Sequence, residues 1–109
     1  MLNRPEIVCL CGSTRFCKLF DDMNREFTLK GKIVLSIGCV TSSDSELGVT
    51  EEQKRMLDEL HKRKIDMADS VFVINKGGYI GESTRSEIEY AGRIGKPVIY
   101  LERLEEVQI

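Results

Sequence analysis

The chain has 109 residues, a formal net charge of −2 and 41% hydrophobic residues, which is the size and composition of one globular domain. It has no stripe of lysine and arginine, no apolar run of membrane-spanning length and no signal-peptide core. We therefore expect a single domain over residues 1–109 in the cytoplasm, with neither a nucleic-acid polymer nor a membrane as its partner.

Strands and helices are predicted to alternate along the chain. The strands are short apolar runs of the kind buried in parallel sheets, and the helices carry apolar residues at three- and four-residue steps. The predicted strands are residues 6–11, 32–37, 70–75 and 97–101, and the predicted helices are residues 16–30, 51–68 and 82–94. Two segments stay open: residues 38–50 are either a lid or disordered, and residues 102–109 are a fifth strand, a helical turn or a dimer contact.

This alternation predicts an α/β fold, a flavodoxin-like three-layer sandwich with a parallel sheet of four or five strands. The expected strand order is 2-1-3-4, followed by 5 if the tail forms a strand. Such a sheet reverses its order between strands 1 and 3, and ligands bind at the carboxyl edge of that switch point. The loops after strands 1 and 3 are therefore the first places to look for a site.

The loop after the first predicted strand reads Gly12, Ser13, Thr14, Arg15. Its hydroxyls and guanidinium, together with the amides of the following helix, are groups that hold a phosphate. The alternative is structural, with Ser13 as a helix cap and Arg15 in solvent. The segment is neither a P-loop nor a dinucleotide-binding glycine motif.

The loop after the third predicted strand contains three glycines between residues 77 and 81, and the hydroxyls of Ser83 and Thr84 follow. Glycine lets a ligand approach the backbone closely, and the free N–H groups of a helix start favour an anion or a hydroxylated ligand. Glu87 lies about one turn further on, where a carboxylate suits covalent or acid–base chemistry. The alternative is that Thr84 and Glu87 form a capping box and only stabilise the helix.

His61 is the only histidine, and it lies on the apolar side of the second predicted helix. A histidine in that setting is commonly a hydrogen-bonded core residue. Cys9 and Cys11 point to the same face of the first predicted strand. A zinc site would call for a second paired group of cysteines or histidines, which the sequence lacks. We therefore expect buried, reduced thiols and neither a metal nor a cofactor.

Three segments together resemble the nucleoside 2-deoxyribosyltransferase superfamily, which includes the deoxynucleoside 5′-monophosphate N-glycosidases. They are Cys-Gly-Ser-Thr-Arg at residues 11–15, Ala-Asp-Ser-Val-Phe-Val at residues 68–73, and Ser-Glu-Ile-Glu-Tyr-Ala at residues 86–91. The resemblance extends from the first strand to the fourth, and the first segment is closer to the N-glycosidase branch.

The resemblance implies roles for individual residues. It makes Glu87 the nucleophile. His61 stands where the family carries an acid, and its implied role is to donate a proton to the leaving base. It also implies two groups of substrate-binding residues. The first group, Gly12, Ser13 and Arg15, surrounds the sugar and its 5′ end. The second group, Gly81, Ser83 and Thr84, binds hydroxyl or phosphate groups. Gly81 replaces a further acid of the transferases, with Glu82 beside it.

The implied function is cleavage or transfer at the N-glycosidic bond of (deoxy)nucleosides or their 5′-monophosphates, without a metal or cofactor. A homodimer or higher homo-oligomer is also implied, because in the family a neighbouring subunit completes the site with a carboxyl-terminal segment. Here only residues 102–109 stand in that position. The alternative is a nucleotide-binding or regulatory module without turnover, which the short tail and the departure at His61 favour.

Overall fold

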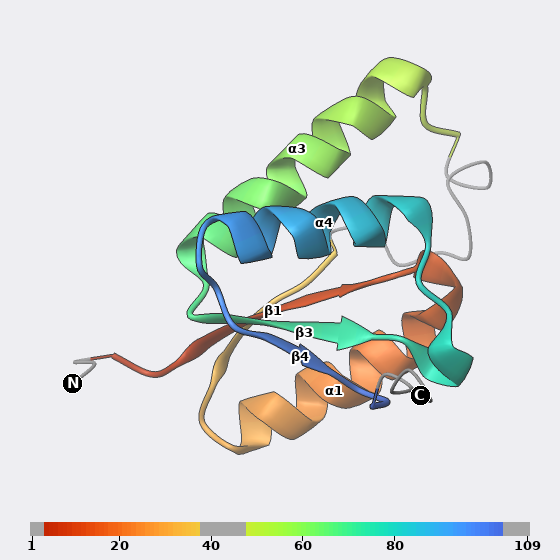
Figure 1. The fold of residues 1–109 in the computed structure, drawn as a ribbon. Coiled ribbons are helices and arrows are strands. Elements are labelled where there is room, and N and C mark those ends of the chain that lie inside the picture. The colour runs from red at the N-terminus through yellow and green to blue at the C-terminus, as the bar shows by residue number, and fades with distance from the viewer. Residues whose placement is uncertain (1–3, 38–47, 104–109) are drawn as a thin grey trace, which may run out of the picture.

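The computed structural model describes residues 4–37 and 48–103. Each predicted strand and helix is present in it, with ends that differ by a few residues (Figure 1). The elements are β1 (Ile7–Gly12), η1 (Thr14–Phe16), α1 (Cys17–Leu29), β2 (Ile33–Leu35), α3 (Glu51–Met67), β3 (Ser70–Ile74), η2 (Lys76–Gly78), α4 (Glu82–Arg93) and β4 (Val98–Tyr100). Most of the two segments left open, residues 38–50 (a lid or disorder) and residues 102–109 (a strand, a helical turn or a dimer contact), lies outside the described residues.

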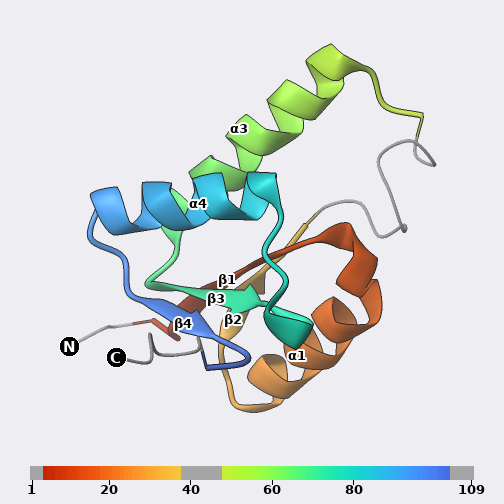
Figure 2. The ribbon, with the colours of Figure 1, turned by 45° about the vertical axis from the view of Figure 1, so that its right-hand side comes forward.

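The four strands form one parallel sheet in the order β2-β1-β3-β4. Helix α1 covers one face of this sheet, and α3 and α4 cover the other (Figures 1 and 2). The predicted flavodoxin-like sandwich is confirmed, with four strands and three α-helices in the described residues. The order reverses between β1 and β3, as expected, so the loops that follow these two strands lie side by side.

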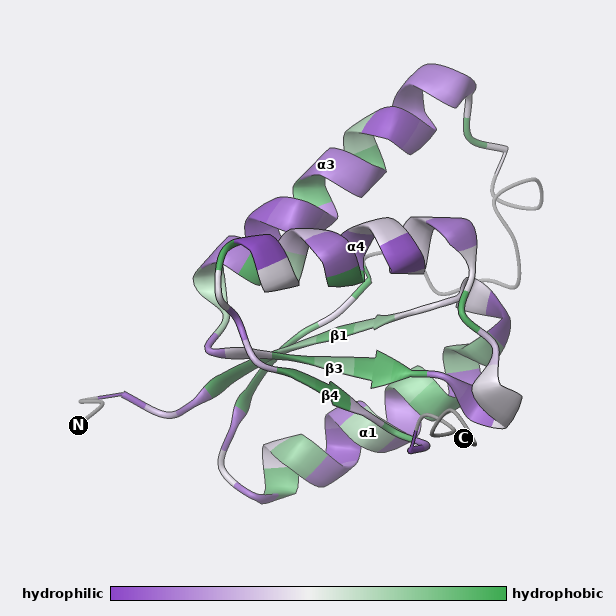
Figure 3. Cartoon of the chain, in the orientation of Figure 1, coloured by the Kyte–Doolittle hydropathy of each residue, from purple (hydrophilic) through white to green (hydrophobic). Residues whose placement is uncertain are grey.

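The sheet divides the core into two clusters because successive side chains of a strand point to opposite faces. The α1 face is lined by Val8, Leu10, Phe20, Phe27, Phe72 and Ile74. The α3/α4 face is lined by Cys9, Cys11, Ile65, Ala68, Val71, Val73 and Ala91. All five residues of β3 are buried, as a central strand covered on both faces requires. The colouring by hydropathy shows the apolar strands between helices with mixed surfaces (Figure 3).

Helix α3 begins with a capping box that we did not predict. The hydroxyl of Thr50 accepts a hydrogen bond from the Gln53 amide at 3.0 Å, and the Gln53 side chain accepts one from the Thr50 amide at 2.9 Å. The first buried residue of this helix is His61, and its amino-terminal half extends beyond the sheet (Figures 1 and 2). The start of α3 is therefore held by its own cap more than by packing.

A charged clamp joins the amino-terminal ends of β1 and β3. The carboxylate of Asp69 accepts hydrogen bonds from Arg4 at 2.7 and 2.9 Å and from the backbone amide of Ile7 at 2.7 Å. The Arg4 guanidinium and the Ile7 amide hold the pKa of Asp69 well below its usual range.

Within the described residues, no helix has the length and apolar character needed to cross a bilayer.

Candidate functional site

A cavity of about 400 Å³ lies where the loops after β1 and β3 meet the helices α3 and α4. This volume is within the range of sites for small molecules. Seven of the eight residues singled out from the sequence line it: Gly12, Ser13, His61, Gly81, Ser83, Thr84 and Glu87. The switch point of the sheet thus brings together two loops that are more than sixty residues apart in the sequence.

Glu87 is a buried carboxylate in the cavity wall, and it is not a helix cap. Helix α4 begins at Glu82 with Gly81 as its N-cap residue, which makes Thr84 the third residue of the helix. The capping-box alternative is therefore wrong, because the helix starts earlier than that pattern requires. Thr84 and Glu87 instead point inward, with 3% and 8% of their surface exposed.

Gly12 allows β1 and β3 to end close together beside the cavity. Its φ angle is +157°, at the edge of the range that favours glycine. A Cβ atom at this position would lie 2.9 Å from the backbone oxygen of Ile74, closer than side chains tolerate. A side chain here would therefore push apart the two strand ends that form the floor of the site.

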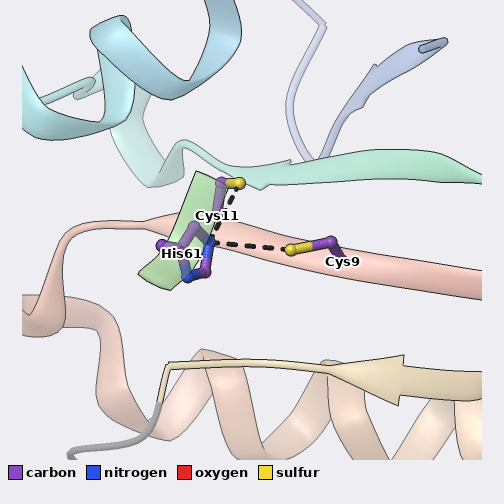
Figure 4. A group of neighbouring side chains, drawn as sticks. All are labelled: Cys9, Cys11 and His61. Atoms are coloured by element: carbon purple, nitrogen blue, oxygen red, sulfur yellow. Dashed lines mark hydrogen bonds between the residues drawn. The ribbon is translucent and has the colours of Figure 1, made fainter. Parts of the chain in front are cut away.

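His61 connects the cavity to two buried cysteines of β1. Its Nε2 atom lies 3.3 Å from the sulfur of Cys11 and 3.6 Å from the sulfur of Cys9, and Figure 4 shows this nitrogen as their common contact. The same nitrogen is 3.8 Å from Oε1 of Glu87. Three elements, β1, α3 and α4, thus direct two thiols, an imidazole and a carboxylate toward one another.

Burial and mutual contact shift the pKa values of all four groups. A hydrogen bond with Cys11 lowers the pKa of Cys9, assisted by His61, while the same bond and burial raise the pKa of Cys11. Burial alone would lower the pKa of His61, but contact with Cys9 and the charge of Glu87 outweigh it and raise this pKa. Burial raises the pKa of Glu87, against the opposing charge of His61.

Arg15 does not line the cavity. Its guanidinium lies over the ring of Tyr79, 3.8 Å from the ring centroid, and the stacked pair links the loops after β1 and β3. Tyr79 itself lines the cavity and was missed in the sequence. The available signal was an aromatic residue directly after a pair of glycines in a predicted ligand loop.

Helix α3 contributes further charged residues that the sequence analysis did not select. Lys54, Asp58 and Lys64 line the cavity on the same side of the helix as His61. Together with His61 they recur at steps of four, three and three residues, and this helical spacing was the available signal. The ammonium group of Lys64 also donates a hydrogen bond to the backbone oxygen of Ser36 at 2.6 Å. The cavity therefore offers charges of both signs to a polar ligand.

The arrangement can bind a polar small molecule and present one carboxylate to it. The ligand atoms of Cys9, Cys11 and His61 also lie within 4.8 Å of one another, as in a site for a soft metal ion. Searches of family models and of curated proteins with this sequence found no match.

Proposed function

We propose that this protein cleaves or transfers at the N-glycosidic bond of a (deoxy)nucleoside or its 5′-monophosphate, with Glu87 as the nucleophile. The main support is the position of Glu87, a buried carboxylate that lines a cavity built from both loops of the switch point. The resemblance of residues 11–15, 68–73 and 86–91 to the nucleoside 2-deoxyribosyltransferase superfamily points to the same chemistry.

The reaction has two steps. The Glu87 carboxylate attacks C1′ of the sugar through an oxocarbenium-like transition state. The C1′–N bond breaks, its electron pair leaves with the base, and the base takes up a proton. Water or a second base then attacks C1′ and releases the Glu87 carboxylate. Cleavage results in the first case and transfer in the second.

The remaining cavity residues suit the parts of a nucleotide. The N–H groups at the start of α4, with Ser83 and Thr84, are donors for a 5′-phosphate or hydroxyl group. The ring of Tyr79 offers a face for a base, and Asp58 offers an acceptor for a sugar hydroxyl or a base N–H.

His61 suits a role different from the one that the resemblance implies. Its Nε2 contacts both thiols and Glu87, so this nitrogen faces the nucleophile and not the leaving base. We assign it as a positioning residue for the Glu87 carboxylate. Asp58, one turn earlier on α3, then becomes the candidate acid on the substrate side of the cavity.

The direct test is Glu87→Gln, assayed by release of free base from deoxynucleosides and from their 5′-monophosphates. Removal of the nucleophile should lower kcat by roughly 10³-fold or more, while nucleotide binding persists. The matched control is Glu89→Gln on the same helix, where the side chain is exposed and activity should stay at the wild-type level. Full activity in Glu87→Gln would refute the proposal.

A second candidate is a nucleotide-binding module without turnover. The contact of His61 with two thiols favours it, because this histidine is then not available to protonate a leaving base. Calorimetric binding of a deoxynucleoside monophosphate, with no base released by the wild-type protein over a long incubation, would support this candidate over the enzyme.

A further inference from the structure

The group formed by Cys9, Cys11 and His61 has the dimensions of a tetrahedral metal site. Zinc binds sulfur at about 2.3 Å and histidine nitrogen at about 2.0–2.1 Å, so a sulfur and a nitrogen on one tetrahedral ion are about 3.5 Å apart. The two distances from Nε2 of His61 to the sulfurs are 3.3 and 3.6 Å. Both sulfur–nitrogen distances therefore match those on a tetrahedral ion, and all three ligand atoms lie within 4.8 Å of one another.

The nature of the donors favours a borderline or soft ion. Two sulfurs and one imidazole suit zinc-class ions and are poor ligands for magnesium or calcium. The fourth position has a candidate of its own, because Oε1 of Glu87 lies 3.8 Å from the same Nε2 atom. A carboxylate is an ordinary fourth ligand of zinc.

Charge and burial are consistent with an ion at this point. Cys9 and Cys11 are fully buried among Ile65, Val71 and Val73. Two thiolates offset the charge of one divalent cation, and the Glu87 carboxylate as fourth ligand leaves a net charge of −1, so no group at the site is an unpaired charge in apolar surroundings. His61 and Glu87 also line the cavity, so an ion has a path from solvent to the sulfurs.

We propose that Cys9, Cys11 and His61 bind a divalent ion of the zinc class at the floor of the cavity, with Glu87 as the fourth ligand. Binding releases the thiol protons, since the sulfurs coordinate as thiolates and the histidine as neutral imidazole. One consequence rests on the proposed function: an ion held by Glu87 occupies the nucleophile, so zinc should inhibit base release. The metal site itself does not depend on that function.

Titration of the reduced, metal-free protein with Co²⁺ tests the site without any assay of activity. We expect one ion per chain, visible bands of tetrahedral strength, and a near-ultraviolet thiolate charge-transfer band with the intensity of two thiolates. Excess Zn²⁺ should abolish these bands by displacing the Co²⁺. A wild-type spectrum with octahedral bands only, or without thiolate charge transfer, would overturn the proposal.

Single variants assign the ligands. Cys9→Ser and Cys11→Ser should each lose about half of the charge-transfer intensity and weaken Co²⁺ binding at least tenfold. Cys17→Ser is the matched control, because Cys17 begins α1 and lies outside the group; its spectrum should match that of the wild type. Unchanged spectra in both Cys9→Ser and Cys11→Ser would overturn the assignment, and if neither variant folds, the thiolate intensity of the wild type decides.

Two further results separate this proposal from the proposed function. Glu87→Gln should keep the thiolate charge-transfer band while its visible bands shift, since only the fourth ligand changes. Co²⁺ binding with both thiolates in a protein that releases no base would retain the metal site and reject the glycosidase. Base release that zinc leaves unaffected, at concentrations where Co²⁺ displacement shows zinc bound, would reject Glu87 as the fourth ligand.

Discussion

The two faces of the sheet differ in what they bury. The face covered by α1 is apolar, with three phenylalanines, two of which, Phe27 and Phe72, contact edge to face at 5.0 Å. The face covered by α3 and α4 buries aliphatic side chains and two thiols together with His61, Thr84 and Glu87. One sheet thus separates an apolar core from a core in which polar groups lie close together.

The difference shows how a small domain can bury several ionisable groups. Polar groups in a core cost free energy unless they have hydrogen-bond or charge partners. Apolar burial elsewhere must offset the part of this cost that the partners do not remove. Here the partners are mutual, since His61 contacts both thiols and Glu87. The α1 face has an apolar cluster of its own on the other side of the sheet.

The largest expected effect comes from breaking the apolar face. Phe72→Ala should lower the free energy of unfolding by about 3–5 kcal/mol, because it leaves a cavity in a packed core. The matched control is Ile99→Ala, the neighbour of Phe72 in the sheet register, whose side chain is 51% exposed. Urea denaturation followed by circular dichroism measures both, and the control should change by no more than about 0.5 kcal/mol. Equal losses would contradict the explanation that burial of Phe72 against α1 sets the size of its effect.

A smaller effect tests the helix that carries the polar groups. Thr50→Ala should lower the free energy of unfolding by about 1 kcal/mol, because it removes the cap of α3. The control is Thr28→Ala near the end of α1, where the threonine is exposed and bonds only locally to Asn24. A loss in Thr28→Ala as large as that in Thr50→Ala would argue against a capping role.

The smallest effect concerns the amino-terminal end of the sheet, opposite the cavity. The pKa of Asp69 is held well below its usual range by Arg4 and Ile7, so its contribution is present above about pH 4 and is lost as the pH falls further. Asp69→Asn should therefore be less stable than the wild type at pH 7, and the difference should shrink as the pH falls below 4. Thermal unfolding across this range measures it. A difference that does not change with pH would refute the electrostatic account.

The fold could be predicted almost entirely from the sequence. Each strand was a short apolar run, and the alternation with helices left one common strand order for a sheet of this size. The capping-box alternative for Thr84 and Glu87 was wrong, because their spacing fits that motif while the helix begins at Glu82, after Gly81. The true capping box at Thr50 and Gln53 had the same signature and was overlooked.

The site could be predicted only in part. Five of the seven candidates that line the cavity could be predicted because these glycine and hydroxyl residues follow strands whose ends must meet. The contact of His61 with Cys9 and Cys11 could not be predicted from spacing, since about fifty residues separate them and the usual zinc pattern has a second paired group of ligands. Arg15 carries no signal in the sequence that would reveal its stacking on Tyr79.

Alternate side chains of the six-residue strand β1 point to opposite faces. The residues beneath the cavity can therefore change without a change in the residues that pack against α1. A substitution at residue 9 or 11 changes the donor atoms beneath the cavity but leaves Val8 and Leu10 against α1. Loss or gain of a single residue within the strand would instead exchange the two sets, with thiols against phenylalanines and branched aliphatic groups against the histidine. The fold should therefore tolerate substitutions in this strand but not the insertion or deletion of a residue within it.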